Sequence, residues 1–321
     1  MVTLASIQAA RERLCGIAVH TPLIQFPLCA QDPRQLFLKP ENQQPIGAFK
    51  LRGAYNKIAQ LSAEDRKRGV ITYSSGNHGQ GVAYAARALG VKAVIVMPAA
   101  APVIKRENTA ALGAALVLVG PTGIERQFKA EELAAQKGYV IIPPYADEQI
   151  IAGQGTVGLE ILEDLPSVEM VLAPVGGGGL ISGVATAIKL TRPEVKMIGV
   201  EPALGGDARA SFIAGHVVQF PAAEVTRTIA DGLRAQCVGD INFEHIRRYV
   251  DDIITVTEDE ILRATQYLNR NPATTAEPSG AVATAGFIFH AAELPTAKLA
   301  VAIVSGGNID PQLLGHMQNP I

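Results

Sequence analysis

At about 150 residues per domain, a chain of 321 residues corresponds to roughly two domains. Apolar residues make up 48% of it and charged residues 18%, which excludes an intrinsically disordered protein. The 28 basic side chains nearly balance the 30 acidic ones, and no apolar run is long enough to span a bilayer. We therefore expect neither a nucleic-acid nor a membrane partner, and predict that the protein binds a small molecule.

The N-terminal segment is predicted to be a helix rather than a secretory leader. It lacks a charged region followed by an apolar one, which a leader requires. Ser6 is the expected cap, and Ile7, Ala10 and Leu14 would share one face. A cytoplasmic protein is then the expectation.

Short β-branched runs alternate with amphipathic stretches along the rest of the chain. The expected strands lie at 35–39, 69–73, 91–97, 115–119, 139–142, 169–174, 196–201 and 298–304. The expected helices lie at 79–89, 104–112, 123–136, 155–164, 181–190, 258–269 and 280–292. Nearly continuous apolar strands separated by helices are typical of parallel sheets covered on both faces, so the predicted fold class is α/β.

These elements form two groups, which suggests two domains. The first group ends near residue 142, the second begins after Pro143-Pro144-Tyr145, and the strand at 35–39 is expected to join the second. The predicted domains are a large discontinuous one of residues 1–60 and 147–321, and a small mobile one of residues 61–146.

The three cysteines, Cys15, Cys29 and Cys237, are scattered along the chain. They show no spacing typical of a metal site or a redox motif. We therefore expect buried, apolar thiols in a reducing compartment.

Four consecutive glycines, Gly176, Gly177, Gly178 and Gly179, follow an apolar strand and precede a helix. Glycines at such a junction let backbone N–H groups converge on an anion, and the helix N-terminus adds its positive dipole end. We predict a phosphate-binding loop here. Because Glu201 ends the next strand, as in a dinucleotide fingerprint, the ligand could be NAD(P) or another phosphate; a plain tight turn is the third interpretation.

Lys50 favours one of these alternatives. Its neighbours Ala48, Phe49 and Leu51 are apolar, which predicts partial burial in place of the usual solvated surface charge. Burial would lower the pKa of the lysine toward that of an amine nucleophile. A buried lysine combined with a phosphate loop is what pyridoxal phosphate requires.

Two further polar segments follow predicted strands. Residues 74–81, SSGNHGQG, open a helix, and their backbone donors and short side chains could bind a carboxylate or a ring oxygen. His78 within this segment could equally be a structural hydrogen-bonding residue. Ser305, in SGGN at the end of the last strand, would point into the crevice where α/β folds bind ligands.

Together these motifs resemble the fold-type II pyridoxal-phosphate enzymes, and in particular the serine/threonine dehydratase and serine racemase group. GAFKLRGA (47–54) resembles the Schiff-base motif of that family, with Ala48 where serine is most common. SSGNHGQG, PVGGGGLISG and SGGN resemble its substrate-carboxylate, phosphate and pyridine-nitrogen segments, and IAGQGT (151–156) and EPSG (277–280) match further segments. The resemblance implies a two-domain fold like that of the tryptophan synthase β chain, with the cofactor in the interdomain cleft.

The resemblance also implies how pyridoxal phosphate is held. Lys50 would carry it as an internal aldimine and later remove the substrate α-proton, while Phe49 flanks the ring. Asn77 would hydrogen-bond the ring hydroxyl, the four glycines would bind the phosphate, and Ser305 would face the ring nitrogen. Since serine is a neutral partner, the ring would be a weaker electron sink, which favours direct loss of a β-leaving group.

The expected reaction is loss of water from L-threonine and/or L-serine, giving a 2-keto acid and ammonia. By resemblance, the substrate would contact Ser74, Ser75, Asn77 and His78. A serine racemase is an alternative, because Ser75 could act as a second base on the opposite face.

Two residues give conflicting indications of the substrate. In a threo-3-hydroxyaspartate dehydratase, the other alternative, Arg126 would bind a second carboxylate; it could also be a solvated charge beside Glu125. Tyr145 resembles the threonine-dehydratase form. A homodimer is also implied by the family.

Glu201, Gly205 and Asp207 resemble the divalent-cation site of the family. Two carboxylates and a backbone carbonyl are hard oxygen ligands that suit Mg²⁺ or Ca²⁺. Gly206 stands where an extra acid is often found, and surface carboxylates are the alternative interpretation.

Overall fold

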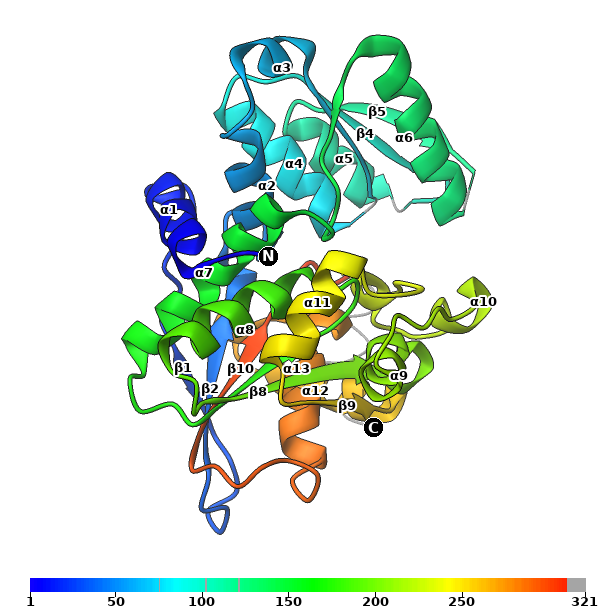
Figure 1. Ribbon diagram of the computed structural model, residues 1–321. Coiled ribbons are helices and arrows are strands. Elements are labelled where there is room, and N and C mark those ends of the chain that lie inside the picture. Colours follow the sequence, from blue (N-terminus) through cyan, green and yellow to red (C-terminus); the bar gives the residue numbers. More distant parts are fainter. Residues whose placement is uncertain (75, 102, 121, 311–321) are drawn as a thin grey trace.

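A computed structural model of the chain describes residues 1–74, 76–101, 103–120 and 122–310. It contains two β-sheets flanked by helices, which confirms the α/β fold class. In Figure 1 the smaller sheet and its helices stand above the larger sheet, and α2 (Lys50–Ile58) lies where the two meet. No helix within the described ranges is both long and apolar enough to cross a membrane.

The larger sheet has six strands in the order β1-β2-β10-β7-β8-β9. They are β1 (Ile24–Phe26), β2 (Gln35–Pro40), β7 (Met170–Pro174), β8 (Lys196–Pro202), β9 (Asp252–Val256) and β10 (Leu299–Val304). All pairings are parallel except that of β1 with β2, so the expectation of purely parallel sheets needs correction at this edge. As predicted, β2 joins the strands of the second group, through parallel pairing with β10.

The smaller sheet has four parallel strands in the order β5-β4-β3-β6. They are β3 (Val70–Tyr73), β4 (Ala93–Pro98), β5 (Ala115–Val119) and β6 (Val140–Ile141). Their continuous apolar runs were the basis of the α/β prediction, and each expected strand of this group is present. Helices α2 and α4 cover one face of this sheet, while α6 covers the other.

Helices bury both faces of the larger sheet. One face packs on α12 and α13, the other on α7, α8 and α11. Besides α2, the helices are α1 (Leu4–Leu14), α3 (Ala63–Arg68), α4 (Asn77–Ala88), α5 (Val103–Ala111), α6 (Gly123–Lys137), α7 (Glu148–Asp164), α8 (Gly179–Thr191), α9 (Asp207–Ala214), α10 (Ala222–Val225), α11 (Asp240–Tyr249), α12 (Glu258–Leu268) and α13 (Pro278–Phe289).

Two helix starts lie three residues or more before the predicted ones, because other residues cap these helices. Thr3, not Ser6, caps α1: its hydroxyl accepts from the Ser6 N–H at 3.2 Å. Helix α7 begins at Glu148 rather than at residue 155, because the Asp147 carboxylate accepts from two N–H groups of the first turn. The face of α1 formed by Ile7, Ala10 and Leu14 is buried as predicted.

The cysteine prediction is wrong for two of the three residues. Cys15 and Cys29 are exposed, and Cys237 is partly buried. All three thiols are free. The spacing of the cysteines carried no information on their burial.

Close contact between helix backbones fixes α2 relative to α8. A Cβ atom on Gly153 of α7 would lie 2.6 Å from the Cα of Gly53 in α2. A Cβ atom on Gly183 of α8 would lie 2.3 Å from the carbonyl oxygen of Ile151 in α7. Only glycine permits such an approach. Because α2 begins with Lys50 and α8 follows the four-glycine loop, α7 sets the distance between these two predicted elements.

Candidate active site

Lys50 is the first residue of α2, and the segment before it is bound to the end of β10. Ala48 forms an isolated antiparallel bridge with Gly306, and the Phe49 N–H donates to the Ser305 carbonyl oxygen at 3.1 Å. Ser305 itself is buried. The structure therefore brings Lys50 and Ser305, which are far apart in the sequence, to the same place at the carboxyl end of the larger sheet.

The Lys50 amine is partly buried and has an unusual environment for a lysine. Its Nζ donates to the Pro144 carbonyl oxygen at 2.7 Å and lies 5.2 Å from the centroid of the Phe49 ring. No ion pair joins it to a carboxylate in the part of the chain that the structure describes. Burial lowers the pKa of Lys50 from 10.5 to about 8. The predicted partial burial is confirmed, and the amine has a substantial neutral fraction near physiological pH.

The four-glycine loop leaves no room for side chains at its two middle positions. A Cβ atom on Gly177 would lie 2.3 Å from the Tyr145 ring, and one on Gly178 would lie 2.9 Å from the Cβ of Asn242. Gly178 also has a φ of +91°, a left-handed conformation that favours glycine. The loop ends at the N-terminus of α8, which no side chain of the described residues caps, and its backbone N–H groups and helix dipole favour an anion such as a phosphate.

Tyr145 connects the lysine to the glycine loop. Its ring contacts Gly177, its backbone carbonyl accepts from Asn242 Nδ2 at 3.2 Å, and the preceding Pro144 carbonyl holds the Lys50 amine. Burial, reinforced by neighbouring groups that include Asp207, raises the pKa of Tyr145 to about 12, so the phenol stays neutral. The sequence identified Tyr145 only as a substrate indicator. The lysine contact is made by a backbone carbonyl, for which no side-chain pattern gives a signal.

Asn77 lies against the SGGN segment from the opposite side. It is the first residue of α4, and a Cβ atom on Gly306 would lie 2.9 Å from its Nδ2. The Asn77 Nδ2 donates to Glu277 Oε1 at 2.5 Å, and Asn308 Nδ2 donates to Asn77 Oδ1 at 2.7 Å. Asn77 is thus close to Ser305, as the predicted site requires. The sequence marked Glu277 and Asn308 only as parts of motifs and assigned them no role.

The other members of the SSGNHGQG segment differ in what they contact. Ser74 is partly buried, and its hydroxyl accepts from the Gly76 N–H at 3.3 Å. His78 is buried, with Nε2 at 3.0 Å from the Ile142 carbonyl oxygen. Burial and the charge of Lys50 lower the pKa of His78 to about 3, so its ring is neutral. This contact is the one expected of a structural hydrogen-bonding residue. Ser75 lies outside the described residues.

Arg126 stands on a different element. It is in the first turn of α6, which covers the smaller sheet, directly after Glu125 of the Thr122 capping box. The side chain is partly buried, and this burial lowers its pKa even though Glu125 acts in the opposite direction. The fully solvated charge considered from the sequence is therefore not what the fold provides.

The two predicted metal-binding carboxylates are wholly buried, so the surface alternative is wrong. Glu201 accepts from the N–H groups of Ala208 and Arg209, at 3.1 and 2.8 Å, and so caps α9. Neither carboxylate oxygen of Asp207 has a hydrogen-bond partner among the described residues. Burial raises the pKa of both groups, that of Asp207 to about 7. Gly205 is buried in the short turn between them, but no cluster of three or more His, Cys, Asp or Glu side chains suited to a metal occurs in the described ranges.

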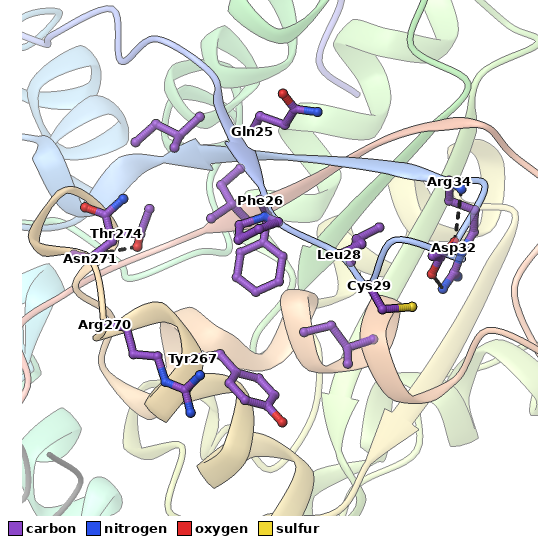
Figure 2. A pocket seen from close by; sticks show the side chains of 14 residues that line it. Gln25, Phe26, Leu28, Cys29, Asp32, Arg34, Tyr267, Arg270, Asn271 and Thr274 are labelled. Carbon is purple, nitrogen blue, oxygen red and sulfur yellow. Dashed lines mark hydrogen bonds and ion pairs between the residues drawn. The ribbon is translucent and has the colours of Figure 1, made fainter. Parts of the chain in front are cut away.

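A pocket of about 520 Å³ opens between β1, the segment that connects β1 to β2, and the C-terminal end of α12. Phe26 and Leu28 give it an apolar wall, Arg270 and Asn271 contribute polar groups, and Arg34 is paired with Asp32 at its far end (Figure 2). No described residue of the predicted site lines it, so it is separate from the arrangement around Lys50.

Comparison with known proteins identifies the family. The model of the family described as "Pyridoxal-phosphate dependent enzyme" matches residues 17–306. The L-threonine ammonia-lyase of Thermotoga maritima is 43% identical over 320 residues, which cover 99% of this chain and 79% of that protein. The L-threo-3-hydroxyaspartate ammonia-lyase of Saccharomyces cerevisiae is 41% identical over 276 residues, 86% of this chain and 83% of that protein.

Solved structures agree with this result. The structure of maize serine racemase superimposes with a TM-score of 0.93 at 36% identity, covering 98% of this chain and 96% of that one. The glycine loop without room for Cβ atoms and the partly buried lysine fit what a phosphorylated aldehyde cofactor needs. The chain belongs to the pyridoxal-phosphate dependent enzyme family, and its cofactor is pyridoxal phosphate.

Proposed function

We propose that this enzyme is an ammonia-lyase that converts L-threonine and/or L-serine to a 2-keto acid and ammonia by eliminating water from the β-carbon. The observation that carries the proposal is the Lys50 amine, which is partly buried, has no carboxylate partner in the described residues and has a pKa lowered to about 8. Such an amine can both act as a nucleophile toward a carbonyl carbon and accept a proton. The name of the Thermotoga maritima relative supports this class of reaction.

The side chains around Lys50 suggest how the cofactor is held. Lys50 would carry its aldehyde, the four-glycine loop its phosphate, Phe49 one face of its ring, Asn77 its hydroxyl and Ser305 its ring nitrogen. When bound, pyridoxal phosphate supplies an electron sink for the bonds at the substrate α-carbon. A serine at the ring nitrogen is a neutral partner, which favours early departure of the β-leaving group over accumulation of negative charge.

The protein would contribute proton transfer, binding and exclusion of water. Lys50 Nζ would take the α-proton, since its lowered pKa keeps part of the amine neutral. The N-terminus of α4 and the Ser74 hydroxyl would bind the substrate carboxylate. Tyr145 would keep water from the glycine loop, because its ring packs directly on Gly177.

The proposed reaction is tested by measuring 2-keto acid release from L-threonine, L-serine and threo-3-hydroxyaspartate. We expect release from the first two, and no release from the Lys50→Ala variant with any substrate. Lys57→Ala is the matched control, because Lys57 lies on the same helix and pairs with Asp147 at 2.7 Å. Equal activity of wild type and Lys50→Ala would contradict the proposal.

The racemase and hydroxyaspartate-dehydratase alternatives share this fold and cofactor, and Arg126 is the residue that discriminates one of them. If Arg126 binds a second carboxylate, Arg126→Ala should abolish release from hydroxyaspartate while sparing release from threonine. Arg87→Ala serves as the control, since Arg87 is an exposed arginine of α4. Racemase activity of Ser75 would appear as D-serine formed from L-serine, which a chiral assay of the same reaction mixtures detects.

A divalent cation, Mg²⁺ or Ca²⁺, is part of the proposal at Glu201, the Gly205 carbonyl and Asp207. Its support is the Asp207 carboxylate, which is buried without a hydrogen-bond partner among the described residues. We assign this cation no step of the reaction. Added Ca²⁺ should raise the melting temperature of the wild type but not of Asp207→Asn; an equal rise in both proteins would count against the site.

We further propose that residues 1–60 and 147–321 form a large domain and residues 61–146 a small one that closes over the substrate. Closure would exclude water from the reactive product. Free and inhibitor-bound crystals should differ by a rotation of the small domain, and identical positions would refute it. A homodimer, suggested by the family resemblance, and a cytoplasmic location, expected from the N-terminal segment, complete the proposal and can be tested by light scattering and cell fractionation.

A further inference from the structure

The side-chain amide of Asn77 forms hydrogen bonds through both its nitrogen and its oxygen, with side chains from distant parts of the chain. Its nitrogen donates to Glu277 Oε1 at 2.5 Å, and its oxygen accepts from Asn308 Nδ2 at 2.7 Å. The Asn308 amide is itself fixed, because its nitrogen also donates to the Ile46 carbonyl oxygen at 2.8 Å. Asn77 therefore connects α4 to the start of α13, to the segment after Ser305 and, through Asn308, to the segment before Lys50.

These two partners define one orientation of the Asn77 amide. If the amide were rotated by half a turn, its oxygen would face the Glu277 carboxylate and its nitrogen would face the Asn308 nitrogen. Two acceptors and two donors would then oppose each other. In the observed orientation both contacts are satisfied, and the second hydrogen on Nδ2 remains available as a donor.

Glu277 is rigidly placed for this contact. Its side chain is buried, with 5% of its surface exposed, and it occupies the N-cap position of α13. Its own N–H donates to the Gly306 carbonyl oxygen at 3.1 Å. A Cβ atom on Gly306 would lie 2.5 Å from Glu277 Oε1, so only glycine at 306 lets the carboxylate reach Asn77.

We propose that Glu277 and Asn308 are positioning residues that act through Asn77. They hold the Asn77 amide so that its second Nδ2 hydrogen donates to the ring oxygen of bound pyridoxal phosphate. This inference rests on the proposed function, which places Asn77 at that oxygen. A carboxylate is a stronger acceptor than a neutral group, so Glu277 fixes the amide more firmly than a glutamine would.

The test is a double-mutant cycle on the holoenzyme with Glu277→Gln, Asn77→Ala and the double variant. The readouts are the affinity for pyridoxal phosphate, the pH titration of the absorbance of the bound cofactor, and the melting temperature of the cofactor-free protein. Glu277→Gln should weaken affinity about tenfold, equivalent to about 1.4 kcal/mol, and shift the titration midpoint. In the Asn77→Ala background the same change should have less than about a twofold effect on affinity.

A second variant changes the other hydrogen bond to the Asn77 amide, the one from Asn308. Asn308→Asp would place an acceptor against Asn77 Oδ1 and so disfavour the observed orientation. We expect the same direction of change as in Glu277→Gln, again dependent on Asn77. Glu64→Gln on α3 is the matched control for loss of one carboxylate charge, because its side chain is 82% exposed; it should leave all three readouts unchanged.

The outcomes separate this inference from the proposed function. If Glu277→Gln and Asn308→Asp lower only the melting temperature, or weaken cofactor binding equally with and without Asn77, the positioning role is wrong. If the wild type retains no cofactor absorbance after unbound pyridoxal phosphate is removed, the proposed function fails instead. If the Glu277→Gln protein does not fold, Asn308→Asp decides the inference alone.

Discussion

Helix α2 carries the buried Arg52 and the partly buried Lys50 only two positions apart, and the surroundings of these two basic side chains are opposite. Arg52 is 1% exposed and makes two-pronged contacts with Glu41 and Glu160, at distances from 2.6 to 2.9 Å. The Lys50 amine instead donates to a backbone carbonyl oxygen, that of Pro144. Burial alone would lower the pKa of Arg52, but its two carboxylate partners raise it, whereas burial lowers the pKa of Lys50 to about 8.

This contrast distinguishes a structural cation from a reactive one. Around Arg52, the buried Lys39 also binds Glu160, at 2.7 Å, and lies 3.7 Å from the Asp164 carboxylate, so the two cations are surrounded by three carboxylates. Such a network holds β2, α2 and α7 together. Around Lys50, the lack of a described carboxylate partner leaves the amine able to lose its proton. The same helix thus gains rigidity from one charge and reactivity from the other.

The largest effect is expected on breaking the Arg52 network. Arg52→Met would leave Glu41 and Glu160 without their main partner, and removing one member of a buried ion pair costs about 3–5 kcal/mol. Urea unfolding of the cofactor-free protein measures this loss. The control is Arg11→Met, because the Arg11–Glu163 pair is at the surface, and it should cost less than about 1 kcal/mol. Equal losses in the two variants would show that the network is not stabilising.

The lowered pKa of Lys50 predicts how the rate of cofactor uptake depends on pH. Only the neutral amine attacks an aldehyde, so the rate at which cofactor-free protein takes up pyridoxal phosphate should rise through about pH 8 and level off above it. A lysine at its ordinary pKa of 10.5 would give a rate that continues to rise well above pH 9. Stopped-flow absorbance over this range distinguishes the two. A profile like that of a free lysine derivative would mean that burial does not lower the pKa.

Local sequence patterns pointed to Lys50 and its surroundings, but not to the ion-pair network around Arg52. The glycine loop and Ser305 stood out because they directly follow apolar strands, and Lys50 stood out because it is a lone lysine among apolar neighbours. Arg52 and Glu160 lie far apart in the chain and had no local signal, so their pairing was invisible. The Pro144 carbonyl was missed for a related reason: any residue type provides that oxygen.

The fold shows the same division. Strand β5 (Ala115–Val119) was predicted at its observed bounds, and the other predicted strands agree to within two residues at each end. The three-residue β1 was not predicted, because a segment that short has little pattern of its own. Strand β9 (Asp252–Val256) was missed although its β-branched residues are typical of a strand. Helix α7 was predicted too short because its glycines obscured the first turns, whereas in the structure they allow α2 and α8 to approach.

The next largest effect is expected from His78, whose pKa is lowered by burial and by the charge of Lys50. Its pKa is about 3 in the folded protein and about 6.5 when unfolded, so the unfolded state binds an extra proton between these values. Stability should therefore fall as the pH is lowered through this window, by about 2 kcal/mol between pH 7 and pH 5. His78→Gln should remove that part of the slope in urea unfolding at the two pH values. An unchanged slope would show that His78 is not buried in its neutral form.

The smallest effect is expected at the edge of the Arg52 network. The buried Thr21 hydroxyl donates to Glu41 Oε1 at 3.0 Å, and hydrogen bonds to charged groups contribute about 1.5–3 kcal/mol. Thr21→Val should destabilise the cofactor-free protein by about 1.5 kcal/mol without changing the pH profile of cofactor uptake. A changed uptake profile would mean that the two regions of α2 are electrostatically coupled rather than separate.

The most direct test of the central claim is to reduce the cofactor-loaded enzyme with borohydride, digest it and locate the cofactor by mass spectrometry. We expect one labelled peptide, with the reduced cofactor on Lys50, and no label in Lys50→Ala. A label on any other lysine, or a wild-type protein that acquires none, would contradict it.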